Sequence, residues 1–415
     1  MSNLQQPQVI VIGGGPAGLT AAYVLKRAGI PFRVYEATDE IGHTWNNLYP
    51  SLRLNTTKWY SHMIDTPMPL HYPIFPTAKQ YHRHMVEFTV RHNLQEHIHT
   101  GVAVTSLRRT GDGLWRVESD MGVDVVPAVI SCTGRFGSPI MPDIPGMDEF
   151  EGEMLHAHDY HGPEPFTGRR VMVVGNGPSG VDIAPEIGVL PMQPTVLLSM
   201  RTGIVLRPRY PLGLPKHAWM ILREHLPAAI GEPLWNYVRD MKFDNLDEVG
   251  IRTPQGGAAS SAAAGTRGRE LIDAVQAGQV KSVPGPVRFY GKCAELADGS
   301  THELDAVIMA TGYSPVIYDY LEEPVPEKEA PVPWPVRDQS TYTPSGAEGG
   351  GYPSDSGREV KGLPGLYLVG IFYQGKGAMY NFRMESEIAV AQITQRLQHV
   401  QMPVTDGEKK RQHVT

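Results

Sequence analysis

The sequence predicts an α/β fold with two Rossmann-like dinucleotide-binding domains, because one glycine-rich pattern occurs twice, 162 residues apart. Each copy follows an apolar stretch and precedes an expected helix. The copies consist of Gly13, Gly14, Gly15, Pro16, Ala17 and Gly18, and of Gly175, Asn176, Gly177, Pro178, Ser179 and Gly180. Since a Rossmann unit ordinarily holds one adenine dinucleotide, we expect a bound flavin in one unit and a diffusible nicotinamide in the other. The chain should be a redox enzyme.

The first unit contains a complete strand, turn, helix and strand. Residues 9–12 form a buried-strand pattern, and the helix should run from Pro16 to about Ala28, where Gly29 ends it. The second strand, 32–35, leads to Glu36. The glycines allow close approach of a pyrophosphate to the helix N-terminus, and Glu36 can accept hydrogen bonds from ribose hydroxyls.

The second unit repeats this order but ends differently. Its strands are expected at 170–174 and 195–200, with a helix to about residue 187 that Pro185 should kink or end early. Arg201 and Thr202 stand where the first unit has Glu36. An arginine there suits a 2′-phosphate, so NADPH is favoured over NADH. The alternative is that Arg201 is an ordinary solvated surface residue.

A third motif lies between the two units, with Phe150, Gly152, His156 and Tyr160 spaced F-x-G-x-x-x-H-x-x-x-Y. It resembles the fingerprint of the flavin-containing monooxygenases, class B flavin-dependent enzymes that bind FAD and NADPH, and its flanking residues look like those of soluble bacterial members. The segments 310–313 and 366–370 resemble further motifs of this family. The resemblance implies a discontinuous FAD domain, 1–160 and 303–415, with an inserted NADPH domain, 161–302.

The resemblance also implies individual site residues. Gly42-x-x-Trp45 and residues 54–58 look like the stretch that lines the flavin, and Asn55 matches the asparagine beside its reactive edge. An Asx turn or a helix cap is the alternative for Asn55. Further cofactor contacts are expected at Thr311, Gly312 and Gly370. His156 and Tyr160 are expected to be mainly structural, with a catalytic base as the alternative for His156.

Enzymes of this family reduce FAD with NADPH, capture O2 as a C4a-(hydro)peroxyflavin and transfer one oxygen atom to a small molecule. Nitrogen or sulfur is the favoured site, because Baeyer-Villiger members generally have Trp where this chain has Tyr160. Baeyer-Villiger oxidation stays an alternative. So does oxidative decarboxylation of a 2-oxo acid, since residues 281–313 resemble an auxin-forming plant branch. An NADPH oxidase or acceptor reductase and a non-catalytic redox sensor are alternatives of other classes.

Composition bounds the partners and the setting. A chain of 415 residues should form two or three compact units. Its net charge of −7 without long runs of one sign disfavours a nucleic-acid or anionic-membrane partner. Two distant cysteines and the lack of a signal sequence or an 18-residue apolar stretch favour a soluble cytoplasmic enzyme. A homodimer is plausible from the family.

The histidine-rich segment, one cysteine and two long segments are not expected to carry out chemistry. No metal site is expected, and most of five histidines should lie at the surface: His82, His84, His92, His97 and His99. Cys132 should be buried and inert. Residues 255–268 and 322–361 should be loops, the second serving as a substrate-side cover.

Overall fold

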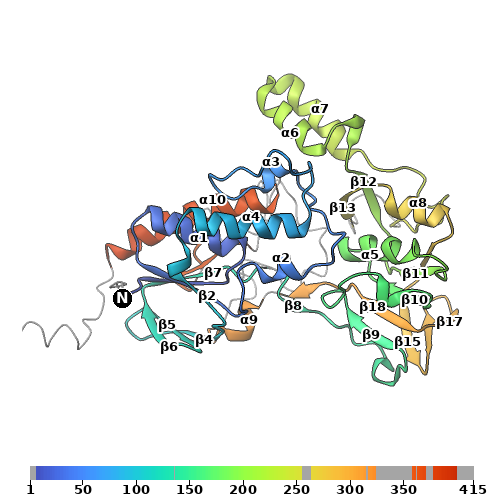
Figure 1. The fold of residues 1–415 in the computed structure, drawn as a ribbon, viewed down its shortest axis with the longest axis horizontal. Helices are drawn as coiled ribbons and strands as arrows, with labels where there is room; N and C mark the ends of the chain where they lie inside the picture. The colour runs from blue at the N-terminus through green and yellow to red at the C-terminus, as the bar shows by residue number, and fades with distance from the viewer. Residues whose placement is uncertain are drawn as a thin grey trace, which may run out of the picture.

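Two parallel five-stranded sheets lie next to each other in an elongated molecule (Figure 1). This computed structural model describes residues 6–134, 136–254, 263–314, 316–323, 358–360, 362–370 and 377–399, with the backbone alone for 263–267 and 318. The sheets correspond to the two predicted Rossmann-like units.

The first sheet has the strand order β20-β7-β1-β2-β3. Its strands are β1 (Val9–Ile12), β2 (Phe32–Glu36), β3 (Ile98–Thr100), β7 (Ala128–Ser131) and β20 (Leu366–Leu368). Side chains alternate between its faces: Val9 and Val11 pack in one core, Ile10 and Ile12 in another.

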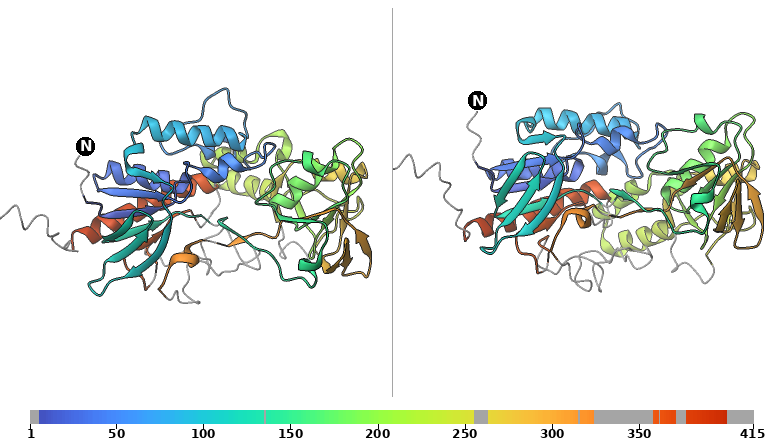
Figure 2. Two further views of the ribbon diagram at one scale, coloured as in Figure 1. Left: turned by 60° about the horizontal axis from the view of Figure 1, so that its bottom comes forward. Right: turned by 90° about the horizontal axis from the view of Figure 1, so that it is seen from below.

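Helices cover one face of the first sheet and a small antiparallel sheet covers the other (Figure 2). The helices are α1 (Pro16–Arg27), α4 (Ala78–Arg91) and α10 (Ala378–Leu397). The small sheet consists of β4 (Val104–Arg109), β5 (Trp115–Ser119) and β6 (Gly122–Val126), and α9 (Ile317–Tyr320) packs beside it. Shorter helices α2 (His43–Asn47) and α3 (Lys58–Ser61) pack on the helical side, α2 against α4 and α3 against α10.

The second sheet has the order β14-β11-β10-β18-β9. Its strands are β9 (Glu153–His156), β10 (Val171–Val174), β11 (Val196–Ser199), β14 (Val280–Val283) and β18 (Ala306–Met309). Helices α5 (Pro178–Gly188) and α8 (Glu270–Gln276) pack on one face, and a hairpin sheet of β15 (Pro286–Tyr290), β16 (Cys293–Leu296) and β17 (Thr301–Glu303) packs on the other. The same three-layer plan therefore occurs twice.

Two chain segments join the sheets. Short strands β8 (Ser138–Pro139) and β19 (Tyr313–Ser314) pair antiparallel, and Ile140 N donates to Gly312 O at 3.0 Å. Strands β9 and β18 belong to the second sheet, although the expected domain boundaries at 160 and 303 assign them to the first domain. The chain thus changes sheets before residue 153 and again after residue 309.

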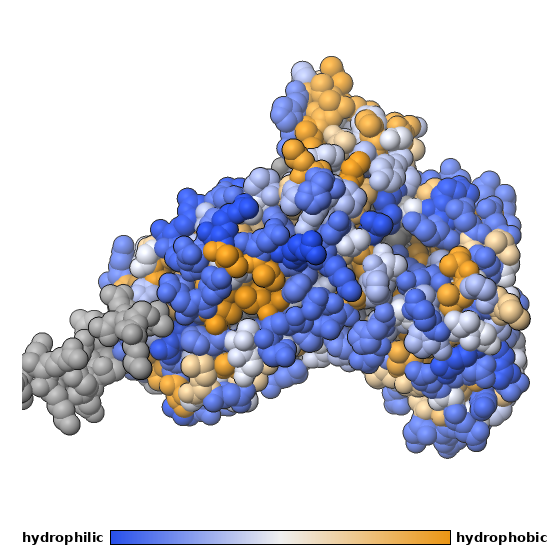
Figure 3. Space-filling model, viewed as in Figure 1, coloured by the Kyte–Doolittle hydropathy of each residue, from blue (hydrophilic) through white to orange (hydrophobic). Residues whose placement is uncertain are grey.

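A helical hairpin projects from the second lobe (Figure 1). It consists of α6 (Lys216–His225) and α7 (Ala228–Asp240) and follows β12 (Val205–Pro208), which pairs in parallel with β13 (Ala263–Arg267). The hairpin exposes large apolar side chains, among them Ile221, Leu222, Ile230 and Tyr237. Figure 3 shows this gathering of apolar residues over the hairpin.

The predicted Rossmann elements are confirmed, and three smaller expectations are wrong. Helix α5 continues through Pro185 to Gly188, so the proline does not end the helix early, although its nitrogen cannot donate the hydrogen bond that another residue would make there. Residues 263–267 form β13 instead of a loop, since pairing with β12 satisfies their backbone.

The third correction concerns the five histidines, none of which is exposed. His84 is buried and its Nε2 accepts from Met63 N at 3.2 Å, while burial lowers its pKa to about 4. The helix and turn that carry these rings pack against the first core, and ring contacts with Tyr23, Phe32 and Tyr35 hold three of them.

Cys132 is buried as predicted, and burial raises the pKa of its thiol. Within the described ranges, no helix has both the length and the apolar character needed to cross a bilayer. Of the expected loop 322–361, residues 324–357 and 361 lie outside the part of the chain that the structure describes, and so do 255–262.

Candidate functional site

The first glycine-rich turn brings the N-terminus of α1 against the carboxyl ends of β1 and β7. Gly13 has φ +107°, and a Cβ on it would lie 2.8 Å from Cys132 O. A Cβ on Gly18 would lie only 1.8 Å from Gly13 O. In contrast, a Cβ on Gly15 would meet no atom within 4 Å. The turn is therefore packed tightly behind and open in front, where the helix N-terminus favours an anion.

Glu36 holds this turn from the end of β2. Its Oε2 accepts from Gly14 N at 2.6 Å, and its Oε1 accepts from Thr38 N and Thr38 Oγ1 at 2.9 and 2.7 Å. The carboxylate is therefore fixed beside the open side of the turn. This is the position from which a carboxylate can contact a ribose.

Gly370 lies on the other side of α1, after β20. A Cβ on Gly370 would lie 2.7 Å from that of Ala17, so the backbone approaches the helix closely. Gly370 N donates to Oε2 of Glu385 at 2.7 Å. Glu385 comes from α10, is fully buried, and has its pKa raised to about 7 by burial.

Trp45, in helix α2, and Asn55, in the loop before α3, come from the segments between β2 and α4. Trp45 is half-buried and contacts the ring of Tyr81 edge-on, with 4.6 Å between centroids. Asn55 is exposed and lies two residues before Thr57, which is the N-cap position of α3. The helix-cap alternative for Asn55 is therefore wrong, because Thr57 occupies that position. The Asx-turn alternative is untested.

The second glycine-rich turn reproduces the first. Gly175 has φ +128°, and its Cβ would lie 2.2 Å from Ala310 O; a Cβ on Gly180 would lie 2.1 Å from Gly175 O. Gly177 faces open space within 4 Å, as Gly15 does. Pro178 and Ser179 begin α5, whose N-terminus points to this space.

Two arginines flank the end of this second site. Arg201 and Thr202 are exposed, and a Cβ on Gly285 would lie 3.0 Å from Arg201 Cγ. Asn176 Nδ2 donates to Thr202 Oγ1 at 3.4 Å. Next to them is a cavity of about 290 Å³ lined by Asp247, Gly250, Ile251, Arg252, Ser282, Val283 and Pro284.

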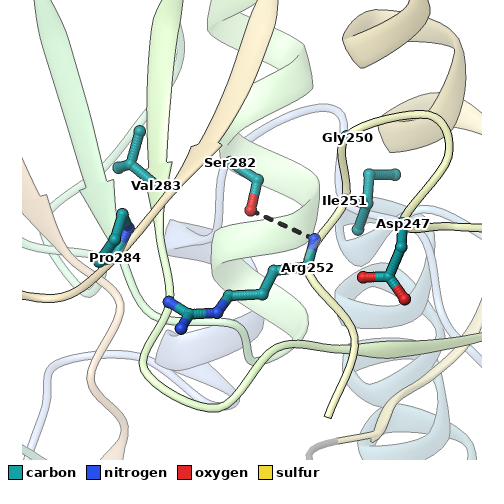
Figure 4. Close-up of a pocket in the computed structure, with 7 residues that line it drawn as sticks. All are labelled: Asp247, Gly250, Ile251, Arg252, Ser282, Val283 and Pro284. Carbon is teal, nitrogen blue, oxygen red and sulfur yellow. Dashed lines mark hydrogen bonds between the residues drawn. The ribbon is translucent and has the colours of Figure 1, made fainter. Parts of the chain in front are cut away.

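Arg252 supplies the positive charge of that cavity. Figure 4 shows its side chain extending beneath Ser282 toward Pro284 and away from Asp247. The Asp247 carboxylate is engaged by Thr253, whose N donates to Oδ1 at 2.9 Å. Arg252 therefore faces the side of the cavity that borders Arg201, an arrangement suited to a phosphate.

The residues of the inter-unit motif lie in the second lobe, near the segments where the chain passes between the lobes. His156 is buried, its Nδ1 accepts from His158 N at 3.0 Å, and its ring contacts Tyr313 at 4.9 Å. Burial lowers the pKa of His156. Tyr160 Oη donates to Glu186 Oε2 at 3.1 Å, and the ring packs against Tyr49. These contacts fit the structural role expected for both residues.

Thr311 and Gly312 lie in the returning segment between the lobes. Thr311 Oγ1 donates to Ile140 O at 2.6 Å, and Gly312 has φ +98°. They stand near the second glycine-rich turn, since Gly175 packs against Ala310. The structure thus groups the predicted residues into two sites, with Gly13, Gly15, Pro16, Ala17, Gly18, Glu36 and Gly370 in the first and Gly175, Gly177, Pro178, Ser179, Gly180, Arg201, Thr202, Thr311 and Gly312 at the second.

Both sites fit a dinucleotide. At each site, two glycines leave no room for a Cβ and a third borders open space. The N-terminus of a helix of eleven or more residues faces that space. The charge at the end of the second strand differs, being negative in the first site and positive in the second.

The sequence also matches a family model described as flavin-binding monooxygenase-like over residues 6–331. The chain belongs to this family. It is 28% identical over 327 residues to the probable indole-3-pyruvate monooxygenase YUCCA9 of Arabidopsis thaliana, covering 76% of each chain. It is 27% identical to the indole-3-pyruvate monooxygenase YUCCA8 of Oryza sativa subsp. japonica, covering 89% of this chain and 87% of the relative.

Solved structures show the same fold. A flavin-containing monooxygenase from Stenotrophomonas maltophilia superposes with a TM-score of 0.66 at 24% identity, covering 94% of this chain and 98% of that chain. Cyclohexanone monooxygenase from Rhodococcus sp. Phi1 bound to NADP+ gives 0.64 at 17% identity, covering 93% and 84%. The predicted family and fold are confirmed. By family the protein is a flavin-binding monooxygenase, and the neighbouring structure of OTEMO is a complex with FAD and NADP.

Two residues at the sites were not predicted from sequence. Arg252 lies in a connecting loop that carries no pattern of its own, so no signal distinguishes it. Glu385 did leave a signal: it falls on the apolar stripe of α10, between Phe382 and Ala389, where a charged residue is unusual.

Proposed function

We propose that the first site holds FAD, that the second holds NADPH, and that the enzyme inserts one oxygen atom from O2 into a small molecule. The opposite charges at the two strand ends carry the assignment. Glu36 offers acceptors to the hydroxyls of a ribose, whereas Arg201 and Arg252 offer donors and charge to a 2′-phosphate.

The domain division belongs to this proposal. The strand memberships of β9 and β18 support boundaries near residues 152 and 310, outside the 160 and 303 expected from the motifs. The FAD domain would then comprise the chain before β9 and after β18, and the NADPH domain the segment between.

The chain's own residues would bind the cofactors, orient the reacting groups and exclude water from the site. Bound FAD supplies the two-electron chemistry that activates O2. We assign to the Asn55 amide a hydrogen bond at the reacting edge, and to Trp45 and Tyr81 an apolar wall that limits water. Preorganised donors and a dry wall favour oxygen transfer over release of H2O2.

The oxygenated atom is a separate part of the proposal. Nitrogen or sulfur is our first candidate, since Tyr160 stands where Baeyer-Villiger enzymes generally have Trp. A 2-oxo acid is the second candidate, because relatives that cover up to 90% of the chain are named indole-3-pyruvate monooxygenases.

The cofactor assignment is tested by removing the positive charge. We expect Arg201→Gln and Arg252→Gln each to lower kcat/KM for NADPH about 10- to 100-fold and to leave NADH nearly unchanged, because a charge-assisted bond to the 2′-phosphate is lost. Arg288→Gln, an exposed arginine on β15, is the control. Equal losses with both nicotinamides would contradict the role in 2′-phosphate recognition.

The reaction is tested with ¹⁸O2 and a panel containing an amine, a sulfide and a 2-oxo acid. One labelled oxygen in the product, with NADPH consumed in proportion, supports oxygenation and identifies the substrate class. NADPH oxidation that yields only H2O2 with every compound would instead support an oxidase.

The remaining partners are proposed from sequence. The small-molecule substrate and O2 follow from the reaction. A homodimer and a cytoplasmic location stay predictions, to be checked by light scattering and by fractionation.

A further inference from the structure

A second cavity, of about 360 Å³, lies where the two lobes meet. Its walls come from α3, from the projecting hairpin and from the start of α10. The residues that carry the argument are Trp59, Tyr60, Ile221, Met379, Tyr380 and Arg383. In Figure 1 the hairpin stands beside α3, with α10 behind it.

This cavity adjoins the proposed flavin wall. Tyr81 Oη donates to Met379 Sδ at 2.7 Å, and the Tyr81 ring contacts Trp45. At the start of α10, a Cβ on Gly377 would lie 2.6 Å from Thr56 Cγ2, next to Asn55. One layer of side chains therefore separates the cavity from the stretch expected to line FAD.

The walls of the cavity expose several large apolar side chains to solvent. Trp59 is 47% exposed, and Ile221 and Tyr380 are each 36% exposed. Three aromatic rings and an isoleucine around a volume of this size suit one flat apolar molecule. The volume is at the lower end of small-molecule sites, which excludes a large ligand.

Arg383 gives the cavity a directed positive charge. Its Nε bonds to Glu387 Oε1 at 3.2 Å, while its two terminal amino groups have no partner among the residues that the structure describes. That edge of a guanidinium matches a carboxylate in geometry. Glu224 lies on the α6 wall, so a bound carboxylate would be placed at the Arg383 side of the cavity, away from that negative charge.

We propose that this cavity binds the substrate and that the substrate is an aromatic molecule with a single carboxylate, which Arg383 holds. The inference rests on the proposed function, because it makes the cavity the entrance to that site. It holds for a 2-oxo acid and equally for an aromatic acid with an amine or sulfide group.

Calorimetric titration of the full-length FAD-bound enzyme tests the inference without turnover. The probes are 3-phenylpropionate and its neutral counterpart 3-phenylpropionamide. We expect the wild type to bind the carboxylate about tenfold or more tightly than the amide, as a charge-assisted pair gives. Arg383→Gln should abolish this preference and change amide affinity less than about twofold.

Two variants complete the design. Trp59→Ala should weaken both probes alike, because it removes the aromatic wall. Arg269→Gln should change the affinity for neither probe. Arg269, the N-cap of α8, forms an exposed ion pair with Asp273 at 3.2 Å, with the same four-residue spacing as Arg383 and Glu387. Unchanged FAD content and Tm show that each variant is folded.

Several outcomes overturn the inference. An Arg383→Gln enzyme that keeps the carboxylate preference, or a wild type that binds neither probe, removes the carboxylate site. If the probes bind but do not inhibit oxygenation competitively, the cavity is not the substrate site. Failure of the oxygenation assay with intact Arg383-dependent binding would instead refute the proposed function alone.

Discussion

At the scale of single residues, Glu385 is a carboxyl group that the fold buries completely. One oxygen accepts from Gly370 N, and the other has no hydrogen-bond partner among the described residues. Burial raises its pKa to about 7, although Arg358 opposes the shift. The folded protein therefore holds this proton more tightly than the unfolded chain does, and folding stability depends on pH.

The sign of that dependence is a prediction. Because the folded pKa lies above the ordinary 4.5, the stabilisation is complete below that value and is lost as pH rises through about 7. In Glu385→Gln this loss should disappear. From acidic to alkaline pH, the free energy of unfolding of the variant should therefore rise by about 3 kcal/mol relative to that of the wild type. Thermal unfolding of the FAD-bound enzyme between about pH 5 and 8 measures it.

The matched control for this prediction lies on the same helix. The Glu387 side chain is 40% exposed, in contrast to the buried Glu385, so Glu387→Gln should keep the wild-type dependence of stability on pH. Parallel stability curves for the wild type and Glu385→Gln would show that the buried carboxyl group does not titrate in this range.

At the scale of elements, each glycine-rich turn contains two kinds of glycine. Gly18 and Gly180 allow a helix to touch the preceding turn, and no larger residue fits them. Gly15 and Gly177 are N-caps with ordinary extended φ and ψ and open space in front. Alanine is therefore compatible with the fold at the second pair, where its methyl group would occupy only the space of a ligand.

This difference predicts the effect of alanine at each turn. Gly15→Ala should fold but lose FAD, with affinity lowered about tenfold or more, because the methyl group displaces the pyrophosphate from the helix N-terminus. Gly177→Ala should keep FAD and lose affinity for NADPH instead. Flavin absorbance after purification and NADP+ titration measure the two effects, and exchanged phenotypes would reverse the cofactor assignment.

At the scale of the whole molecule, two adjacent crossing segments set how the lobes face each other. Strands β8 and β19 pair, and Thr311 Oγ1 donates to the Ile140 carbonyl. Tyr49, from the first lobe, also packs in the core of the second. The two dinucleotides would therefore be positioned by contacts that belong to neither site alone.

Removing one such contact should slow reduction of the flavin. We expect Thr311→Val to keep its FAD content but to lower the rate of reduction by NADPH several-fold, because small misplacements of reacting groups are costly. Anaerobic stopped-flow absorbance measures the rate. Thr311→Ser keeps the hydroxyl group and should behave as the wild type; equal rates in both variants would remove this role of the hydrogen bond.

The sequence predicts local elements of this structure well and long-range contacts poorly. The strands, turns and helices around Gly13 and Gly175 are local, so the chain pattern predicts them nearly to the residue. The strand at 263–267 and the burial of His84 depend on partners distant in sequence, β12 and Met63. Local composition carries no information about such partners, so the expected loop 255–268 is wrong where β13 forms, and so is the expectation that most of the five histidines lie at the surface.

Periodicity and glycine spacing act over short distances, so the chain pattern alone predicts two dinucleotide-binding turns, one ending in Glu36 and the other in Arg201. Only the tertiary structure placed Arg252 beside Arg201, Glu385 beneath Gly370 and Arg383 at an aromatic cavity between the lobes. These groups come from separate loops and helices, so tertiary packing within and between the lobes decides which charges meet.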